Sequence, residues 1–451
     1  MNIQAIRPLK IAVIGSGISG LSSAWLLSQQ HQVTLFEKDD RLGGHSNTVD
    51  VTHGTSSVAV DTGFIVYNPV NYPNLVRFFE TLGVQSRETE MSFGVSLDEG
   101  RLEYSGTGLP GLLAQKRNML RPRFWSMLLD LSRFYREAPH YCEDPDTASL
   151  TLGELLQREH YGTAFIQDHL LPMGAAIWST PVDLMLQYPA LAFLRFCQNH
   201  GLVQLKDRPQ WRTVKGGSRS YVNKIEAGLR RRGEVRLNSH IRRIVRSEGK
   251  IVLEFLHGER ETFDHVVLAC HANQALQLLH TPSTLEQQLL GAFSYQRNRA
   301  VLHSDSSLMP RSKSAWASWN YLAAQQHSGQ REVSVSYWMN RLQHLPDALP
   351  LYVTLNPLRE PESGTVHRSF LYDHPTFSLA ALDAQKQLWD LQGQQNTWFC
   401  GAYFGYGFHE DGLQAGLAVA EELGGRPRPW TLDTPNHRIH VNLKARLVVP
   451  A

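Results

Sequence analysis

Cysteine is scarce in this chain, and long apolar runs are missing. Four of the 451 residues are cysteines, and no two of them form a C-x-x-C pair. A disulfide framework or a zinc module is therefore not expected, no metal is predicted, and a reducing compartment fits best. No stretch reaches about 18 consecutive apolar residues, so no membrane span is predicted. Because Met1–Lys10 contains no apolar segment of the kind a secretory signal needs, we expect a cytoplasmic protein.

An excess of one charge is also missing. The chain has 44 Lys and Arg residues against 42 Asp and Glu residues, a formal net charge of +2. A basic field over the whole molecule is thus excluded, and no nucleic-acid partner is predicted. At roughly 100–200 residues per domain, the length predicts two or three domains. The composition does not indicate which reaction the protein catalyses, and that information has to come from the motifs.

A dinucleotide-binding pattern begins at Lys10. The apolar run Lys10–Ile14 is typical of a buried parallel strand and leads directly into the G-x-G-x-x-G of residues 15–20. Residues 21–30 predict a helix, and residues 32–36 predict a second strand that ends at Glu37. A helix that begins at such a loop points free N–H groups at a pyrophosphate. The cofactor-binding residues predicted in this unit are Gly15, Ser16, Gly17, Ile18, Ser19, Gly20 and Glu37.

The three glycines and the acidic residue of this pattern each meet a physical requirement of dinucleotide binding. Gly15 makes the tight turn, Gly17 allows a pyrophosphate to approach the backbone, and Gly20 allows the helix to pack on the strand. Glu37 is placed to accept hydrogen bonds from a ribose diol. Its charge also disfavours a 2′-phosphate, so NADP is a poor candidate for this site.

The segment that follows Glu37 favours FAD over NAD as the predicted cofactor. It resembles the E-x-x-x-R-x-G-G-[RH] signature of flavoproteins with two dinucleotide-binding domains, which simple NAD dehydrogenases usually lack. In those proteins the Gly–Gly pair passes close to the FAD pyrophosphate and the arginine stabilises it. We therefore predict FAD as the cofactor. The binding residues that this signature adds are Lys38, Arg41, Gly43, Gly44 and His45.

The chain as a whole is similar to the bacterial stand-alone NAD/FAD-binding group of the flavin-containing amine oxidase superfamily. It is also similar to the N-terminal flavin domain of plant cyclopropane fatty acid synthases. The resemblance spans about residues 10–423. It is carried by Asp61-Thr62-Gly63-Phe64, Asn71-Tyr72-Pro73-Asn74, Met91-Ser92-Phe93, Phe124-Trp125, Ile177-Trp178-Ser179, Arg208-Pro209-Gln210-Trp211, Ser220-Tyr221-Val222-Asn223-Lys224, Leu355-Asn356-Pro357 and Gly405-Tyr406-Gly407-Phe408-His409-Glu410-Asp411-Gly412.

This resemblance implies an α/β fold. A glutathione-reductase-type, Rossmann-like FAD-binding domain would be interleaved with an amine oxidase-like α+β substrate domain. The predicted FAD-binding domain comprises 1–65, 205–280 and 391–425; the substrate domain 66–204 and 281–390; and the C-terminal tail 426–451. Within the FAD domain, apolar patterns predict strands at 235–238, 241–246, 251–255, 265–270 and 398–400, and helices at 273–280 and 417–423.

The resemblance also implies further contacts to the cofactor. These residues are Thr62, Gly63, Gly217, Ile241, Ala269, Gly401, Glu410, Asp411, Gly412 and Leu413. Some amine oxidases attach the flavin to a cysteine in the loop before the last helix. Here Cys400 lies on the predicted strand before that loop, so we predict non-covalent FAD.

His409 and Glu410 are the candidate catalytic residues. A histidine with a pKa near neutrality suits a proton shuttle, and a carboxylate at a helix N-terminus is favoured by the helix dipole. The alternative is a capping cluster that only positions the loop. The spacing does not decide between these two interpretations.

Residues 109–136 form a basic amphipathic segment. Its six basic residues, set against the single acid Asp130, are Lys116, Arg117, Arg121, Arg123, Arg133 and Arg136. Such a segment is typical of peripheral contact with the inner membrane face. The alternative is a solvated helix pair that covers the substrate domain.

Three functions remain open from the sequence. The first is an FAD-dependent oxidoreductase that oxidises or desaturates an apolar substrate, a fatty-acyl or phospholipid acyl chain. The second is a flavin amine oxidase acting on a small molecule. The third is a non-catalytic, flavin-bearing partner of a lipid methyltransferase.

Overall fold

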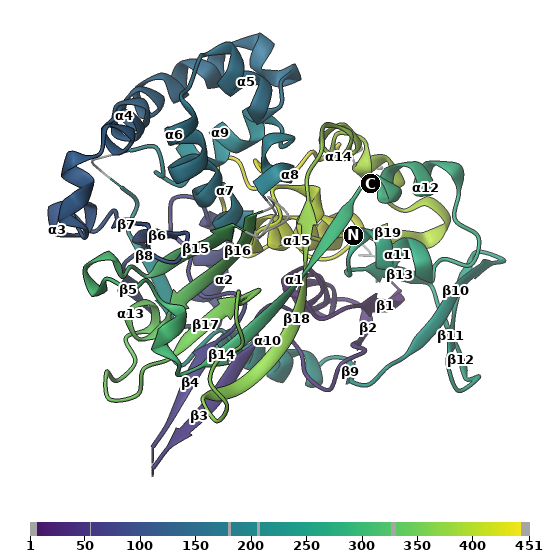
Figure 1. Cartoon of the computed structure of the whole chain (residues 1–451). Helices are drawn as coiled ribbons and strands as arrows, with labels where there is room; N and C mark the ends of the chain where they lie inside the picture. The colour runs from purple at the N-terminus through teal and green to yellow at the C-terminus, as the bar shows by residue number, and fades with distance from the viewer. Residues whose placement is uncertain (1–6, 55, 179–181, 205–207, 326–330, 443–451) are drawn as a thin grey trace.

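The computed structural model describes residues 7–54, 56–178, 182–204, 208–325 and 331–442 (Figure 1). Ser179 of the resemblance and residues 443–451 of the predicted tail lie outside this range. A five-stranded sheet forms the centre of the predicted FAD domain, and its pairings are all parallel. Its order is β19 (Thr397–Phe399), β13 (His265–Leu268), β1 (Lys10–Ile14), β2 (Gln32–Phe36) and β9 (Glu234–Arg236). Three distant parts of the sequence therefore build one sheet.

Two helices on this sheet differ from their predicted bounds. Helix α1 covers Ile18–Leu27, so it begins inside the glycine motif, and α15 covers His409–Glu422, eight residues ahead of the predicted start at 417. The glycines at 412 and 416 lower helix propensity, which hid the first turns of α15 from the sequence pattern. The Asp411 carboxylate accepts a hydrogen bond from the Phe408 N–H at 2.7 Å and caps this helix.

The predicted strand-rich meander is present beside the parallel sheet. Strands β10 (Ile241–Ser247), β11 (Lys250–Phe255) and β12 (Arg260–Phe263) form a separate antiparallel sheet. Helix α11 (Ala272–Leu278) follows β13. Helix α10 (Arg219–Arg230) leads into β9 and packs against α1.

A mixed seven-stranded sheet joins the two sequence pieces assigned to the substrate domain. Its order is β18 (Val366–Thr376), β14 (Ser294–His303), β17 (Tyr352–Leu355), β16 (Arg331–Trp338), β15 (Trp319–Gln325), β6 (Phe93–Leu97) and β7 (Leu102–Ser105). Only the β15–β6 pairing among them is parallel, and it is the pairing that links the two pieces.

Helices and hairpins complete the structure. Two-stranded sheets pair β3 (Thr48–His53) with β4 (Ser56–Asp61), and β5 (Ser86–Thr89) with β8 (Trp211–Val214). The remaining α-helices with described bounds are α2 (Pro73–Leu82), α3 (Leu109–Leu112), α4 (Pro122–Glu143), α5 (Leu152–Arg158), α6 (Thr163–Phe165), α7 (Leu171–Trp178), α8 (Val182–Leu186), α9 (Ala190–Asn199), α12 (Thr284–Gly291), α13 (Met339–Gln343) and α14 (Leu379–Gln385). Figure 1 shows α4–α9 gathered above the seven-stranded sheet. None of the helices in the described ranges is both long and apolar enough to cross a bilayer.

The described part of the C-terminal tail, residues 426–442, packs on the predicted FAD domain. Trp430 stacks on Trp25 of α1, with ring centroids 6.5 Å apart. The Arg428 guanidinium pairs with Glu421 at 2.8 Å, and Arg438 pairs with Asp411. The tail therefore contributes buried arginines to the predicted FAD domain.

Helices α1 and α15 meet through glycine. A Cβ at Gly416 would lie 2.3 Å from the backbone oxygen of Ser19. We expect Gly416→Ala to lower the free energy of unfolding by about 1–3 kcal/mol, because the helices must separate. Urea denaturation followed by circular dichroism measures this. Gly291→Ala is the matched control, since a Cβ at this exposed helical glycine would meet no atom within 4 Å. Equal midpoints for the two variants would contradict the packing described.

Candidate cofactor and active site

The glycine motif brings the backbones of β1, β13 and α1 into direct contact. Gly15 has a φ of 99°, and a Cβ there would lie 2.8 Å from the Ala269 backbone oxygen. A Cβ at Gly20 would lie 1.8 Å from the Gly15 oxygen. At Gly17, by contrast, a Cβ would meet no atom within 4 Å. The open space therefore lies at the middle glycine, where the sequence predicts the pyrophosphate.

The N-terminus of α1 is built for an anion. Ile18, Ser19 and Gly20 form its buried first turn, which contains no acidic residue, and no side chain caps the helix at Gly17. The first N–H groups of a helix have no partner within the helix. A negatively charged group in front of Gly17 would receive these hydrogen bonds and the favourable end of the dipole.

Glu37 and the Gly43–Gly44 turn pack against this loop. The Glu37 carboxylate is buried at the end of β2 and accepts hydrogen bonds from the Ser16 N–H at 2.9 Å and the Ser16 hydroxyl at 2.5 Å. The Gly43 N–H donates to the Ser16 carbonyl at 3.1 Å, and a Cβ at Gly44 would lie 3.2 Å from the Gly17 Cα. The two motifs thus form one continuous backbone surface.

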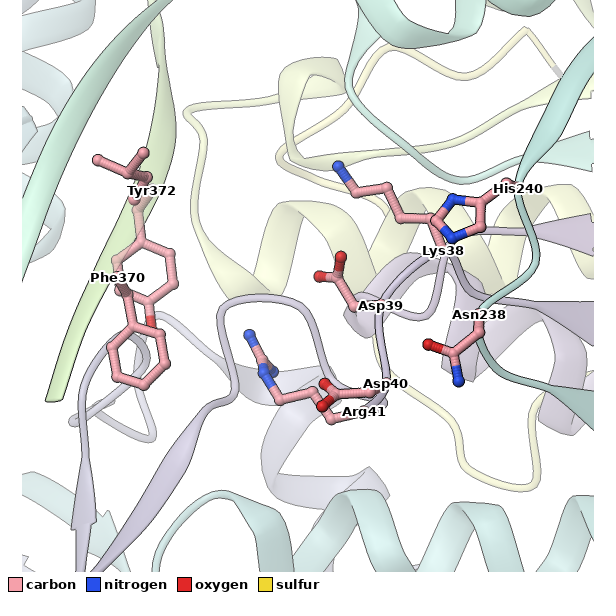
Figure 2. Close-up of a pocket in the computed structure, with 9 residues that line it drawn as sticks. Lys38, Asp39, Asp40, Arg41, Asn238, His240, Phe370 and Tyr372 are labelled. Atoms are coloured by element: carbon pink, nitrogen blue, oxygen red, sulfur yellow. The ribbon is translucent and has the colours of Figure 1, made fainter. Parts of the chain in front are cut away.

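A pocket of about 470 Å³ opens beside this surface (Figure 2). Figure 2 shows Lys38 and Arg41 on one side and Phe370 and Tyr372 of β18 across from them. The full lining is Lys38, Asp39, Asp40, Arg41, Asn238, His240, Phe370, Leu371 and Tyr372. The pocket therefore brings together the predicted contacts Lys38 and Arg41, whereas the predicted contact Ile241 is not part of its lining.

Three half-buried histidines lie together next to the Gly–Gly turn. The ring centroid of His45 is 5.3 Å from that of His374 and 6.3 Å from that of His271. Burial lowers the pKa of His271 and of His374 to about 4 and the pKa of His45 well below its usual value, so all three are neutral at neutral pH. In the described structure no group of three or more His, Cys, Asp or Glu residues is arranged to hold a metal ion.

Several buried polar atoms here lack a hydrogen-bond partner among the described residues. They include His45 Nε2, His271 Nδ1 and the Tyr403 hydroxyl. His45 follows the Gly–Gly turn, His271 follows β13 and Tyr403 follows β19. All three residues therefore lie at the edge formed by the carboxyl ends of the parallel strands. Ligands of open α/β sheets bind at this edge. Unpaired polar atoms, an uncapped helix and open space at Gly17 together fit a dinucleotide such as FAD.

The remaining predicted contacts pack around the same turn. A Cβ at Gly63 would lie 2.2 Å from the His45 oxygen, and the Thr62 hydroxyl lies 2.8 Å from the Tyr372 hydroxyl. Gly217, with a φ of 83°, precedes Ser218, whose N–H donates to the Asp61 carboxylate at 2.9 Å.

The last predicted segment approaches the first one. A Cβ at Gly412 would lie 2.8 Å from the Ser19 hydroxyl oxygen, and Leu413 is fully buried beside it. Gly401 lies two residues after the end of β19, where a Cβ would meet the Tyr403 ring at 2.5 Å. The N-terminal turns of α1 and α15 therefore converge, as predicted for a single cofactor.

The thiol of Cys400 is buried and its pKa is raised by that burial. Cys400 directly follows β19 and lies in the hydrophobic core. This placement favours the predicted non-covalent FAD over a thioether to the flavin.

His409 is a half-buried, neutral histidine. Its ring stacks on Phe64 with centroids 3.7 Å apart, and its Nε2 lies 2.9 Å from the Ser46 hydroxyl and 3.1 Å from the Tyr221 hydroxyl. Burial lowers its pKa to about 3. Protonating His409 at neutral pH would therefore be unfavourable. Its contacts favour a role in positioning its neighbours over a role as a proton shuttle.

Glu410 and Asp411 are engaged by structural contacts. Glu410 accepts hydrogen bonds from the Asn74 N–H at 3.1 Å and the Leu75 N–H at 3.0 Å, and thereby caps α2. Asp411 pairs with Arg438 at 2.7 Å and caps α15. Of the two interpretations left open by the sequence, the capping cluster describes these contacts better than a catalytic Glu410.

Some residues at the site were not among the predicted contacts. Tyr372 and His374 reach the His45 turn from β18 and carried no signal in the sequence. Tyr221, which reaches His409 from α10, and Asp61 stood in segments that carry the family resemblance, but no role was predicted for them. Asp61 accepts hydrogen bonds from Ser218 and from the Gln343 amide. Their neighbours are far apart in the chain, so no local spacing reveals them.

Comparisons with known proteins agree with this arrangement. The sequence model of the family described as flavin containing amine oxidoreductase matches residues 18–424. The chain is similar to the 15-cis-phytoene desaturase of Solanum lycopersicum, with 26% identity over 268 residues, which is 55% of this chain and 44% of the desaturase. It thus spans less than half of that relative's length.

Solved structures show the same fold. A fatty acid isomerase from P. acnes, described as producing CLA, superposes with a TM-score of 0.64 at 16% identity, covering 90% of this chain and 97% of the isomerase. Cyclohexylamine oxidase from Brevibacterium oxydans superposes with a TM-score of 0.63 at 17% identity, covering 92% and 99%. The predicted fold class is confirmed.

Gly17→Ala separates cofactor binding from folding. The φ of −62° at Gly17 suits alanine, and a Cβ meets no protein atom, so the variant should fold normally. The methyl group would occupy the space predicted for the pyrophosphate, and we expect FAD affinity to fall by about tenfold or more, equivalent to about 1.4 kcal/mol. Flavin content and FAD titration measure this, with Gly291→Ala as control. Unchanged FAD affinity would place the pyrophosphate elsewhere.

Buried neutral histidines predict acid sensitivity. Burial lowers the pKa of His200 and His409 to about 3 and of His169 to about 4, against about 6.5 in an unfolded chain. Between these values the unfolded state binds more protons, so the free energy of unfolding should fall as pH drops from about 6.5 to about 4.

The histidine-to-glutamine substitution His409→Gln should reduce this pH dependence. Glutamine retains a hydrogen-bonding group but takes up no proton, so the slope near pH 5 should decrease by about one proton. Urea midpoints measured across this range test the effect. The exposed His257→Gln should leave the slope unchanged. Identical slopes for all three proteins would show that His409 titrates normally.

Proposed function

Because the chain belongs to the flavin containing amine oxidoreductase family, we propose that it is an FAD-dependent oxidoreductase that oxidises or desaturates a fatty-acyl or phospholipid acyl chain. FAD would be held by the glycine loop at residues 15–20 and by the Gly43–Gly44 turn, and it would supply the redox chemistry as a two-electron hydride acceptor at N5 that oxygen or another electron carrier can reoxidise. The side chains of the protein need only orient the substrate, exclude water and manage the proton.

One observation carries the choice of an apolar substrate: the buried carboxylates already have partners. Asp168 pairs with Arg123, Glu286 with Arg246, and Asp411 with Arg438. The complete set of buried acids in the described chain, each accepting hydrogen bonds or paired with arginine, is Glu37, Asp61, Glu103, Asp168, Glu254, Glu286, Glu410 and Asp411. No spare buried anion is therefore offered to a substrate ammonium.

Lysine placement supports the same choice. A lysine beside the flavin, within an aromatic cage, would favour an amine oxidase. The lysines in the described ranges are all exposed: Lys10, Lys38, Lys116, Lys215, Lys224, Lys250, Lys313 and Lys386.

The relatives lend weaker support. One is named for desaturation of phytoene and one for isomerisation of a fatty acid, and both names denote apolar substrates. The likeness to cyclohexylamine oxidase keeps a flavin amine oxidase as the second candidate. The exposed lysines and satisfied carboxylates weigh against it.

Anaerobic stopped-flow mixing distinguishes the candidates. The flavin-loaded protein is mixed separately with fatty acids, with phospholipids, and with putrescine and cyclohexylamine, and the visible absorbance of oxidised flavin is followed. We expect bleaching with an acyl substrate and none with the amines. Bleaching by amines alone would establish an amine oxidase. Bleaching by none of them, in a protein whose flavin dithionite reduces, would leave the non-catalytic partner of a lipid methyltransferase.

A further inference from the structure

Exposed apolar side chains concentrate in one short segment. Five of the eleven large hydrophobic residues that are exposed in the described structure fall within residues 109–129. We call these five the apolar tip: Leu109, Met119, Leu120, Trp125 and Leu129. Leu120 is 86% exposed and Leu129 is 73% exposed. Contiguous exposed apolar residues on a folded protein generally mark an interaction surface.

The apolar tip lies on three consecutive elements. Leu109 begins α3, Met119 and Leu120 end a short 3-10 helix over Lys116–Leu120, and Trp125 and Leu129 lie in the first turns of α4. Figure 1 shows α3 and α4 along the outer edge of the molecule. The opposite side of α4 is anchored in the core by Phe124, Met127 and Phe134, which are buried.

The six basic residues of this segment divide into two groups. Arg123 pairs with Asp168 at 2.7 Å, Arg133 with Asp130 at 3.0 Å, and Arg136 with Glu137 at 2.8 Å. These three cations are therefore neutralised within the protein, which removes half of the positive charge apparent in the sequence.

The other three cations, Lys116, Arg117 and Arg121, have no carboxylate partner among the described residues. Arg117 donates to the Gly100 carbonyl at 2.8 Å, and Arg121 donates to the Arg101 carbonyl at 2.7 Å. Partial burial, followed by the positive charges of Arg117 and Arg101, lowers the pKa of Arg121. Positive charge is thus left uncompensated directly beside Met119 and Leu120.

Trp125 has the orientation of an interfacial residue. Its ring is half exposed, while its indole N–H donates to the Met119 carbonyl at 2.8 Å. Tryptophan is enriched where an apolar phase meets a polar one.

We propose that the apolar tip docks on a bilayer containing anionic phospholipids. The leucines of the tip would enter the boundary of the acyl chains, and Lys116, Arg117 and Arg121 would contact lipid phosphates. Exposed leucines, unpaired cations and an interfacial tryptophan are the combination expected of a membrane-surface helix. A protein partner fits less well for Lys116, because lysine is depleted in protein interfaces. Docking does not depend on the proposed substrate, so the two proposals fail independently.

Co-sedimentation of the flavin-loaded protein with vesicles tests this proposal. Vesicles of phosphatidylcholine mixed with phosphatidylglycerol should bind the protein, and vesicles of phosphatidylcholine alone should bind it more weakly. Binding should also weaken as salt increases, because exposed charges are screened. Absence of binding to the mixed vesicles at low salt would overturn the proposal.

Variants assign the binding to the tip. Leu120→Ser with Leu129→Ser should weaken binding to mixed vesicles by about tenfold or more, because two buried leucines are lost. Lys116→Glu and Arg117→Glu should each weaken it about fivefold, at about 1 kcal/mol per cation, without the same loss on phosphatidylcholine alone. Leu256→Ser, at a leucine outside the tip that is 60% exposed, is the matched control.

Flavin content and circular dichroism confirm that each variant is folded. Equal vesicle binding by the tip and control variants would overturn the assignment. A tip variant that changed the oligomeric state but not vesicle binding would identify a second copy of the chain as the occupant and would overturn it too.

Discussion

Helix α1 has no room for side chains where it meets its neighbours, and the candidate site depends on this close approach. Gly20 lies against the Gly15 backbone, and Gly412 and Gly416 bring α15 onto Ser19. Because backbones touch backbones here, the ends of β1, β13 and β19 and the starts of α1 and α15 converge. The same approach leaves the space at Gly17 open toward the uncapped helix N-terminus. The anion site is thus a consequence of packing.

The interior around this site is polar, and its buried carboxylates accept hydrogen bonds or pair with arginines. Half-buried histidines such as His45 and His374 stay neutral because ionisation would have to overcome desolvation. Buried carboxylates are held by arginines or by backbone N–H groups, as Glu410 is at the start of α2. Arg438 from the C-terminal tail neutralises Asp411.

Much of the fold followed from local pattern, and the misses have physical causes. The strands β1 and β2 and the acid Glu37 were predictable because each depends on a few adjacent residues. The start of α15 was not, because Gly412 and Gly416 disfavour a helix locally and are retained for their contact with α1. The roles of Tyr372 and His374 were not predictable either, since β18 reaches the site only through the seven-stranded sheet.

The sequence by itself determined the dinucleotide unit, the likeness to FAD proteins and the basic, apolar character of residues 109–136. These properties can be predicted from short motifs, because turn geometry, helix starts and local charge depend on neighbouring residues. Only the tertiary structure decided which charges remain free. It paired Arg123 with Asp168, left Lys116 and Arg117 without a carboxylate partner within the part of the chain that the structure describes, and turned Glu410 into a helix cap. Ion pairs and desolvation depend on three-dimensional distance, which residues far apart in the chain acquire only on folding.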